Sequence, residues 1–526
     1  MLEDHEPIFG KNVIETLSEG MYDNPLFLFR EYVQNAADAI DAAERSGALE
    51  KGEGQIEVSI DAEKRLITFE DNGTGIPKDA VKKMLANIGD SQKDRKTDKG
   101  FRGIGRLGGL GYCQKVRFET STKGELTKSI LEWDARNLHE ILADKNDHVH
   151  AGQLIKRITS TWEEPCKSAE HFFKVSLINV HKSNDDLLNV DDVRNYLSMV
   201  APVPFDYAKF RFIKDIEEFL KENQLDIPHE YRLNLNGDEV RKGYETPLKI
   251  DKDKAIDILG VDCHVLRSGG KVIGWYWFCV SEFDGVLPKK CWQRGIRLRK
   301  ANIQIGEADC LSNHPKREAL WRDDRGNNYF IGEIHALDED LIPNSRRDYF
   351  NQDDTCRRFE MALQCEFRDL YDLYRDASVI RSATKKIKAA ETARKDFIVK
   401  EKTNVFYTDI AKEQARQQVN KAQKEAMEAQ QTIARFQAKA NAGQLSGKGA
   451  SPLAKVVAAY RPEETSAITR SLPVRNSRSK QSFVKENLGR EAQQILDIVF
   501  NVLEEKLPPG EVAPIRDEIL KRASHL

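Results

Sequence analysis

The sequence lacks several features that would each assign it to a familiar class. It has no run of about 18 or more apolar residues, so no transmembrane helix and no membrane partner are expected. Its eight cysteines form no C-x-x-C pair, which favours reduced thiols in a cytoplasmic protein over zinc or disulfides. The net charge of −3 gives no overall basic field, so contact with nucleic acid would require a local patch.

Two common nucleotide-binding patterns are also missing. No G-x-x-x-x-G-K-[ST] occurs, which excludes a P-loop, and the absence of H-R-D and D-F-G excludes a protein kinase. Gly103, Gly105 and Gly108 do spell the dinucleotide pattern G-x-G-x-x-G. That fold needs a hydrophobic strand directly before the glycines, whereas the preceding residues here are "DSQKDRKTDK".

The glycines are nevertheless dense, with six of the chain's 32 in "GFRGIGRLGGLGYC" (100–113). We interpret this segment as a turn that enters a helix and presents free backbone N–H groups, an arrangement that suits a triphosphate. Upstream, "NIGDSQK" offers Asn87, Ser91 and Lys93 on a charged segment that could fold over the ligand as a lid.

Residues 25–46 are predicted to form a helix in which Glu31, Asn35 and Asp38 lie within roughly 60° of one another. Two interpretations remain open: a wide solvated face, or a carboxylate that orients water beside an amide that holds Mg²⁺. A separate polar face, expected to meet solvent, carries Arg30, Gln34 and Asp41.

Residues 55–71 alternate like the two strands of a hairpin, and the second strand ends at Asp71. Gly73 and Gly75 follow in "FEDNGTGIP". This is either a plain turn or a carboxylate that accepts the exocyclic amine of a base, with glycines that let the ring approach the backbone.

Composition divides the rest of the chain. We expect a first α/β domain over 1–204, a second over 205–376 with strands in "GGKVIGWYWFCVSEF" and "GIRLRKANIQIG", and a helical stalk or coiled coil over 377–442. No glycine or proline occurs from Asn344 to Ala442, which favours long helices. A flexible linker over 443–480 and a short helical unit over 481–526 complete the prediction.

Taken in order, the motifs E-x-x-x-N-x-x-D, D-x-G-x-G, a lid with lysine and G-x-x-G-x-G resemble the GHKL ATPase superfamily. "LFLFREYVQNAADAIDAA" is most similar to the ninety-kilodalton heat-shock chaperones (HtpG-like), whereas "GFRG" is more similar to MutL and Morc proteins. The resemblance implies an α+β protein: a Bergerat-type α/β sandwich that binds ATP, an α/β middle domain and, from composition, a long helical C-terminal region.

The resemblance also implies site roles. Asp71 would hold the adenine amine, supported by Gly73 and Gly75; Asn35 would ligate Mg²⁺, with Asp38 beside it; and Glu31 would activate the attacking water. The phosphates would be wrapped by the segment that holds Gly100, Phe101, Gly103 and Gly105, with Asn87 and Lys93 from the lid. The usual threonine of a late strand is missing from "FFKVSLINV".

A match to the chaperone middle domain continues through "FIGEIHALDEDLIPNSRRDYFNQDD". It implies that Arg347 reaches the γ-phosphate, with Arg346 as the alternative if the register slips by one. The other interpretation of "NSRRDYF" is a charged helix start. The expected function is a Mg-ATP-dependent clamp that acts on protein clients as a homodimer; the alternative is a MutL- or Morc-like switch that acts on DNA or in a defence assembly.

Overall fold

The computed structural model describes residues 9–18, 24–88, 105–251, 254–283, 285–314, 317–403, 406, 409–441, 450–459 and 488–523. The chain divides into two compact units, Met1–Tyr371 and Asp372–Leu526, and each is described by itself. The first unit packs helices on mixed sheets and the second is helical, which confirms the α+β class. Among the described helices, none combines the length and apolarity needed to cross a membrane.

The first sheet contains, within the described residues, β1 (Gln55–Asp61), β2 (Leu66–Asp71), β3 (Cys113–Ser121), β4 (Thr127–Asp134), β5 (Thr159–Pro165), β6 (Phe172–Val180), β7 (Arg232–Leu235) and β8 (Asp238–Glu239). The strand order is β5-β4-β3-β6-β2-β1-β7-β8. All neighbours are antiparallel except β1 and β7, which are parallel. The sheet is therefore mixed.

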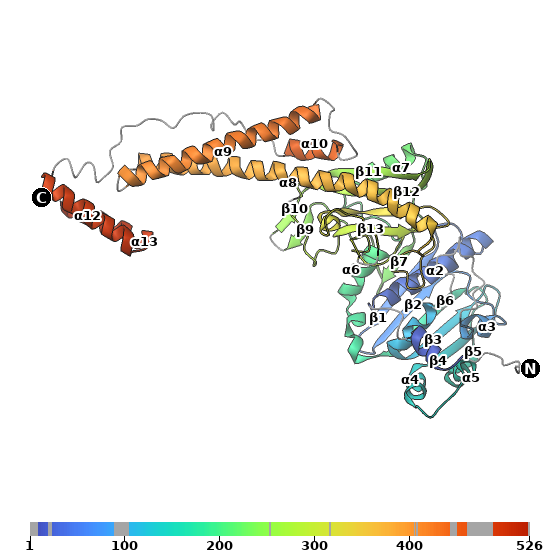
Figure 1. Cartoon of the computed structure of the whole chain (residues 1–526). Helices are drawn as coiled ribbons and strands as arrows, with labels where there is room; N and C mark the ends of the chain where they lie inside the picture. Colours follow the sequence, from blue (N-terminus) through green and yellow to red (C-terminus); the bar gives the residue numbers. More distant parts are fainter. Residues whose placement is uncertain are drawn as a thin grey trace, which may run out of the picture. The chain divides into compact units, whose positions relative to one another are not determined.

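The predicted hairpin over 55–71 is confirmed by β1 and β2, whose alternate residues are buried. Helix α2 (Phe27–Ser46) packs on this buried face (Figure 1). The ring of Phe69 lies 5.3 Å from that of Phe29 and 4.7 Å from that of Tyr32, measured between centroids. These contacts fix α2 over the strand that ends at Asp71.

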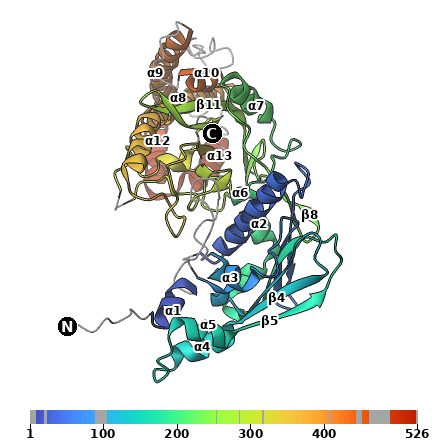
Figure 2. The same ribbon diagram turned by 90° about the vertical axis from the view of Figure 1, so that its right-hand side faces the viewer.

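Further helices of the first unit are α1 (Asn12–Ser18), α3 (Val81–Ala86), α4 (Ala135–Ala143), α5 (Ala151–Ile158) and α6 (Val190–Val200), with 3-10 helices η1 (Gly105–Gly111) and η2 (Lys182–Leu188). Helix α5 contacts both α1 and α4 (Figure 2), and η1 contacts α1 and α2. The short helix η1 thus brings the end of the glycine-rich segment against α2.

The second sheet contains, within the described residues, β11 (Ile258–Ser268), β12 (Lys271–Ser281), β13 (Gly295–Lys300), β14 (Ile303–Gln304) and β15 (Ile331–Ala336), in the order β11-β12-β15-β13-β14. Strands β12 and β13–β14 confirm the two strand predictions made for this region. Around the sheet lie α7 (Ile213–Glu222), the small β9 (Leu248–Asp251) and β10 (Lys254–Ile256) pair, and η3 (Gly326–Tyr329).

The two sheets are interleaved along the chain. Strands β7 and β8 follow α7, yet they complete the edge of the first sheet beside β1. Leu233 and Leu235 are fully buried in the core of the first sheet. The boundary expected at 204 stays a prediction, but part of the first sheet comes from residues beyond it.

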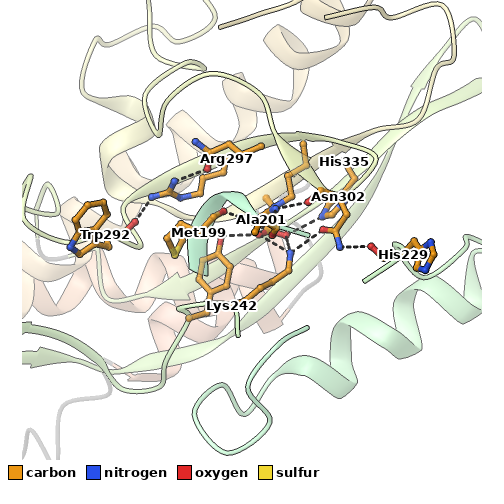
Figure 3. A network of polar contacts seen from close by, with 12 residues as sticks. Met199, Ala201, His229, Lys242, Trp292, Arg297, Asn302 and His335 are labelled. Carbon is orange, nitrogen blue, oxygen red and sulfur yellow. Dashed lines mark hydrogen bonds and ion pairs between the residues drawn. The ribbon is translucent and has the colours of Figure 1, made fainter. Parts of the chain in front are cut away.

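A buried ionic network ties α6 to the second sheet (Figure 3). Arg299 donates to the carbonyl of Met199 (2.5 Å) at the end of α6 and lies 2.6 Å from Glu333. Lys242 lies 2.9 Å from the same carboxylate, and His335 shares it at 3.0 Å. Because buried charges are stable only when they are paired, this network fixes α6 against β13 and β15.

In its described residues, the second unit consists of helices. Helix α8 (Asp354–Lys402) begins in the first unit and runs into the second without a break, and α9 (Asp409–Asn441) turns back along it. Phe397 of α8 and Val419 of α9 are buried between them. The long helices predicted from the missing glycine and proline are confirmed, and their apolar side chains meet within one chain.

Within the described residues, three shorter helices follow: α10 (Ala450–Ala459), which packs on α9, and the hairpin of α12 (Arg490–Lys506) and α13 (Pro509–Ala523). Helix α10 lies within the range expected to be a flexible linker. The other residues of that range, 443–449 and 460–480, lie outside the described residues.

Candidate ATP-binding site

Helix α2 supplies three predicted site residues, and its ends explain its bounds. The side chain of Asn24 accepts a hydrogen bond from the N–H of Leu26 (3.0 Å), which satisfies a donor at the start of the helix. At the other end Gly47 takes φ 72°, the left-handed conformation that glycine adopts without strain, and bonds to carbonyls of the last turn.

The site residues of α2 are largely buried. Glu31 is 7% exposed and Asp38 is 4% exposed, while Asn35 between them is half-buried. Among the described residues, Oε1 of Glu31 is buried and accepts no hydrogen bond. This burial disfavours a wide solvated face, and a buried acceptor of this kind marks a position where a water or ligand group fits.

The expectation that the other polar face of α2 meets solvent is wrong for Arg30 and Gln34, each 1% exposed. The guanidinium of Arg30 lies over the ring of Phe27 (4.2 Å) and 3.6 Å from the carboxylate of Glu31. Its Nη2 donates to the carbonyl of Arg346 (3.5 Å). For Arg30 the physical reason is this contact with the loop around residue 346, which helical periodicity cannot reveal.

Asp71 ends β2 on the buried side of the strand. Ile67, Phe69 and Asp71 alternate toward the same face, and Phe69 contacts α2. Asp71 is 4% exposed, and its Oδ1 accepts a hydrogen bond from the N–H of Gly73 (3.0 Å). The structure therefore aims the carboxylate at the layer between sheet and helix.

The two glycines after Asp71 are required by packing within the chain. A Cβ on Gly73 would come within 2.6 Å of the Ala39 carbonyl carbon of α2. Gly75 has φ 67°, and a Cβ there would come within 2.0 Å of the Ser121 carbonyl oxygen of β3. Both positions need glycine whichever ligand binds.

The glycine-rich segment is described only from Gly105 onward; Gly100, Phe101, Gly103 and Lys93 lie outside the described residues. Gly105 begins η1, and a Cβ on it would lie 2.8 Å from Oε2 of Glu31. The end of this segment thus lies against the predicted catalytic carboxylate. Asn87 is exposed where α3 ends.

Arg347 lies beside Glu31, although 316 positions separate them in the sequence. Its Nε is 4.0 Å from Oε1 of Glu31, and its side chain is 8% exposed. Arg346, the alternative, is exposed. Of the two arginines, Arg347 is the one whose guanidinium faces the predicted site.

The loop that carries Arg347 is closed by its own backbone. Asn344 donates its N–H to the carbonyl of Tyr349 (2.9 Å) and Asn351 donates to Ile342 (2.9 Å). Helix α8 begins later, at Asp354, so "NSRRDYF" is not a helix start. Arg347 has φ 53°, a conformation that costs a non-glycine residue free energy and recurs at functional sites.

Sequence reasoning missed the surroundings of Asp71. Phe173 of β6 lies directly opposite Asp71, and Thr120 of β3 lies opposite Phe173. The buried Thr120 hydroxyl accepts from the N–H of Ile76 (2.8 Å) and donates to Phe172 (2.9 Å). No signal around Thr120 could have indicated this, because it depends on the pairing of β3 with β6.

The donor set fits a nucleotide with a hard cation. The site offers one amide at Asn35, carboxylates at Glu31 and Asp38 around it, and a guanidinium at Arg347. Mg²⁺ takes few protein ligands beside phosphate oxygens and water, so a single amide oxygen is adequate ligation.

Comparisons with known proteins find relatives of the region that carries α2 and β2. Residues 28–160 match the family described as histidine kinase-, DNA gyrase B-, and HSP90-like ATPase. The chain is 31% identical over 145 residues to the chaperone protein HtpG of Shewanella loihica and 31% identical over 144 residues to that of Shewanella baltica. Each match covers 24% of this chain. The chain spans about a fifth (22%) of the length of these relatives.

Proposed function

We propose that the chain is a Mg-ATP-dependent conformational clamp, because residues 28–160 match the histidine kinase-, DNA gyrase B-, and HSP90-like ATPase family and are similar to HtpG. It binds ATP, hydrolyses it slowly and acts on protein partners in a chaperone-like manner. The observation that carries this proposal is the approach of Arg347, in the loop between β15 and α8, to Glu31 of α2.

Each described site residue has a role in this proposal. Asp71 accepts the adenine amine through the carboxylate oxygen that is not bonded to Gly73. Asn35 holds Mg²⁺, which neutralises phosphate charge when bound. Glu31 orients the attacking water and takes its proton, a role supported by its buried oxygen. Asp38 contributes negative charge beside the cation.

Arg347 stabilises the charge that develops on the γ-phosphate, because a guanidinium stays charged and offers several donors. The position of Arg347 depends on a loop between the second sheet and α8. Hydrolysis therefore requires this loop and helix α2 of the first sheet's layer to be in place together. Turnover that depends on such docking is slow and conformationally gated.

The test is steady-state ATP hydrolysis by the full chain with Glu31→Ala. Loss of a general base predicts a decrease of about 10²-fold or more in kcat with ATP affinity nearly unchanged. The matched control is Asp185→Ala, which removes an exposed carboxylate of η2 that pairs with Arg65 (2.6 Å), just before the start of β2 and at the end opposite Asp71. Unchanged turnover in Glu31→Ala removes this residue from the mechanism.

One observation favours the alternative, a switch that acts on DNA. Residues 381–402 of α8 contain eight basic and three acidic side chains. On a helix, five of the basic residues fall within about 100° and extend over about 32 Å; this basic stripe consists of Arg381, Lys385, Lys388, Lys395 and Lys402. A stripe of that length suits a phosphate backbone.

Addition of duplex DNA to the hydrolysis assay distinguishes the two functions. A DNA-acting switch predicts stimulation that decreases steeply with salt and is lost in Lys385→Gln/Lys388→Gln/Lys395→Gln. Lys386→Gln/Lys400→Gln, on other faces of α8, is the control. No stimulation by DNA, together with stimulation by an unfolded protein, leaves the chaperone-like function.

A further inference from the structure

A cavity of about 390 Å³ lies in the first unit beside helix α6, and we call it the α6 cavity. Its lining comes mainly from α6 (194–199), from the end of β8 with the residues after it (239–249), and from the residues that lead into β13 (290–293). Its volume is that of a site for a small molecule. The residues assigned to the ATP site take no part in its lining, so it is a separate feature.

Positive side chains outnumber negative ones in the lining of the α6 cavity by six to three. Each of the three carboxylates already lies 2.8–3.9 Å from a lysine or arginine close to it in the sequence. They are therefore poorly placed to hold a metal cation, and the excess of positive charge favours an anion instead. The positive side chains are Arg194, Lys209, Arg241, Lys242, Lys249 and Lys290.

Two of the lysines at the cavity are held only loosely. Lys209 lies 3.6 Å from Asp206 and Lys249 lies 3.9 Å from Glu245, and the two lysine side chains are 68% and 74% exposed. Exposed ion pairs of this kind contribute little to stability. These ammonium groups can therefore turn toward a ligand at small cost.

Behind the cavity wall lies an excess of buried positive charge (Figure 3). Arg297, Arg299 and Lys242 are each at most 4% exposed. Among the described residues, the one carboxylate within ion-pair distance of them is Glu333, which pairs with Arg299 and Lys242. Burial raises the pKa of the neighbouring Glu230 to about 7, so this group supplies only part of a negative charge at neutral pH.

Arg297 connects this buried excess to the cavity. Its Nη1 donates to Gln304 (2.7 Å), and its Nη2 donates to the carbonyl of Trp292, a residue that lines the cavity. In the part of the chain that the structure describes, its buried Nε has no hydrogen-bond partner. Burial lowers the pKa of Arg297 and, together with Arg299, lowers that of Lys242 to about 8. Because buried cations need counter-ions, an anion in the cavity would stabilise this region.

Hydrogen bonds between segments hold the walls of the cavity in place. The N–H of Gly243 donates to the carbonyl of Ser198 in α6 (3.2 Å), and the N–H of Glu245 donates to Oε1 of Gln293 (3.3 Å). The segment after β8 is thus bonded to both of the other walls. A cavity that is already formed costs little to order when a ligand enters.

We propose that the α6 cavity binds a small multivalent anion of the phosphate class, either an inorganic diphosphate or the diphosphate group of a small organic molecule. The anion would contact the exposed cations of the rim and offset the buried positive charge behind the wall. Because α6 follows the first sheet and residues 290–293 lead into the second, the ligand would also strengthen the join between them. The proposal does not rest on ATP hydrolysis.

Calorimetric titration of the full chain with inorganic diphosphate, without Mg²⁺ or nucleotide, tests the proposal. The wild type is expected to bind one diphosphate per chain, with an affinity that decreases as salt is added. Lys209→Gln/Lys290→Gln should raise the Kd by about tenfold or more, because the loss of one charge-assisted hydrogen bond accounts for roughly that factor. A wild type that does not bind diphosphate, or equal binding by this variant, overturns the proposal.

Two further variants show where the diphosphate binds. Lys64→Gln/Lys167→Gln removes two lysines that are 77% and 88% exposed and do not line the cavity, so it should bind diphosphate like the wild type. Arg347→Ala alters the ATP site and should also bind normally. Binding that is lost in Arg347→Ala and retained in Lys209→Gln/Lys290→Gln places the anion at the ATP site and overturns the proposal.

Uridine diphosphate distinguishes an organic from an inorganic ligand. Its uracil lacks the exocyclic amine that Asp71 is proposed to receive, so it is a poor ligand for the ATP site. Trp292 lines the cavity and is 42% exposed, which leaves an aromatic surface on which a ring can stack. Tighter binding of uridine diphosphate than of diphosphate, with the difference lost in Trp292→Ala, indicates an organic ligand. Equal affinities indicate the inorganic anion.

Discussion

At the scale of single residues, Asp71 illustrates how one carboxylate serves two purposes. One oxygen accepts the N–H of Gly73 and fixes the turn, and the other can receive a ligand. An amide in its place keeps the acceptor for Gly73 and replaces only the second oxygen with a donor. Fold and ligand binding can therefore be separated at this position.

We predict that Asp71→Asn lowers ATP affinity strongly, by about 10- to 100-fold or more, because an NH₂ group would face the adenine amine at a cost of roughly 1–3 kcal/mol. Calorimetry measures the affinity, and a thermal melt within a few degrees of wild type shows that the turn is retained. Near-normal ATP affinity in a folded variant contradicts the role assigned to Asp71.

Arg347 permits a similarly clean comparison, because Arg346 is its exposed neighbour. We predict that Arg347→Ala lowers kcat on the order of 10²–10³-fold, since transition-state arginines contribute that much or more. ADP affinity should be unchanged, because ADP lacks the γ-phosphate. Arg346→Ala is the matched control, and equal losses in both variants would argue for a general disturbance of the loop.

At the scale of elements, the site depends on how closely the chain approaches α2. Gly73 meets α2 at Ala39, and Gly105 meets it at Glu31. The two contacts differ in kind: the first is against backbone, which cannot move, and the second is against the end of a side chain. Substitution at Gly105 should therefore displace the carboxylate and leave the fold intact.

We predict that Gly105→Ala lowers kcat by roughly tenfold or more with little change in stability, because a Cβ 2.8 Å from Oε2 shifts Glu31 from its position. Gly152→Ala is the control, since a Cβ there meets nothing within 4 Å. Hydrolysis rates and melting temperatures are compared for both. Unaltered turnover in Gly105→Ala would indicate that the position of Glu31 is not critical.

The elements also show what the sequence could and could not predict. Local sequence predicted the β1–β2 hairpin, strand β12 and the long helices, because the strands follow from short apolar patterns and the helices from the absence of glycine and proline. It failed at Arg30, whose burial depends on a loop more than 300 residues away. The sequence also did not predict that β7 pairs with β1, because a strand of four residues is too short to show a clear alternation of apolar and polar residues.

At the scale of the whole molecule, acid should weaken the join between α6 and the second sheet. Burial lowers the pKa of His335 to about 4 from 6.5, despite the neighbouring Glu333. Burial alone would raise the pKa of Glu333, but Arg299 and Lys242 hold it well below its usual value. Both shifts mean that the unfolded chain binds more protons than the folded chain as pH decreases.

The sign follows from linkage: where the unfolded state binds more protons, stability decreases on acidification. For His335 the window lies between pH 6.5 and about 4, and we predict a loss of about 2 kcal/mol between pH 7 and pH 5. Urea unfolding at several pH values measures the slope, which His335→Gln should flatten. An equal slope in wild type and variant would assign the acid sensitivity elsewhere.

The late return of β7 to the first sheet has a practical consequence for dissection of the protein. A fragment cut at residue 204 would lose β7 and expose the backbone of Gln55–Val58 along β1 as a bare edge. Such edges recruit strands from other molecules, so aggregation would be mistaken for failure of the ATP site. A fragment that extends past Val240, which is 1% exposed in the same core, keeps the edge covered.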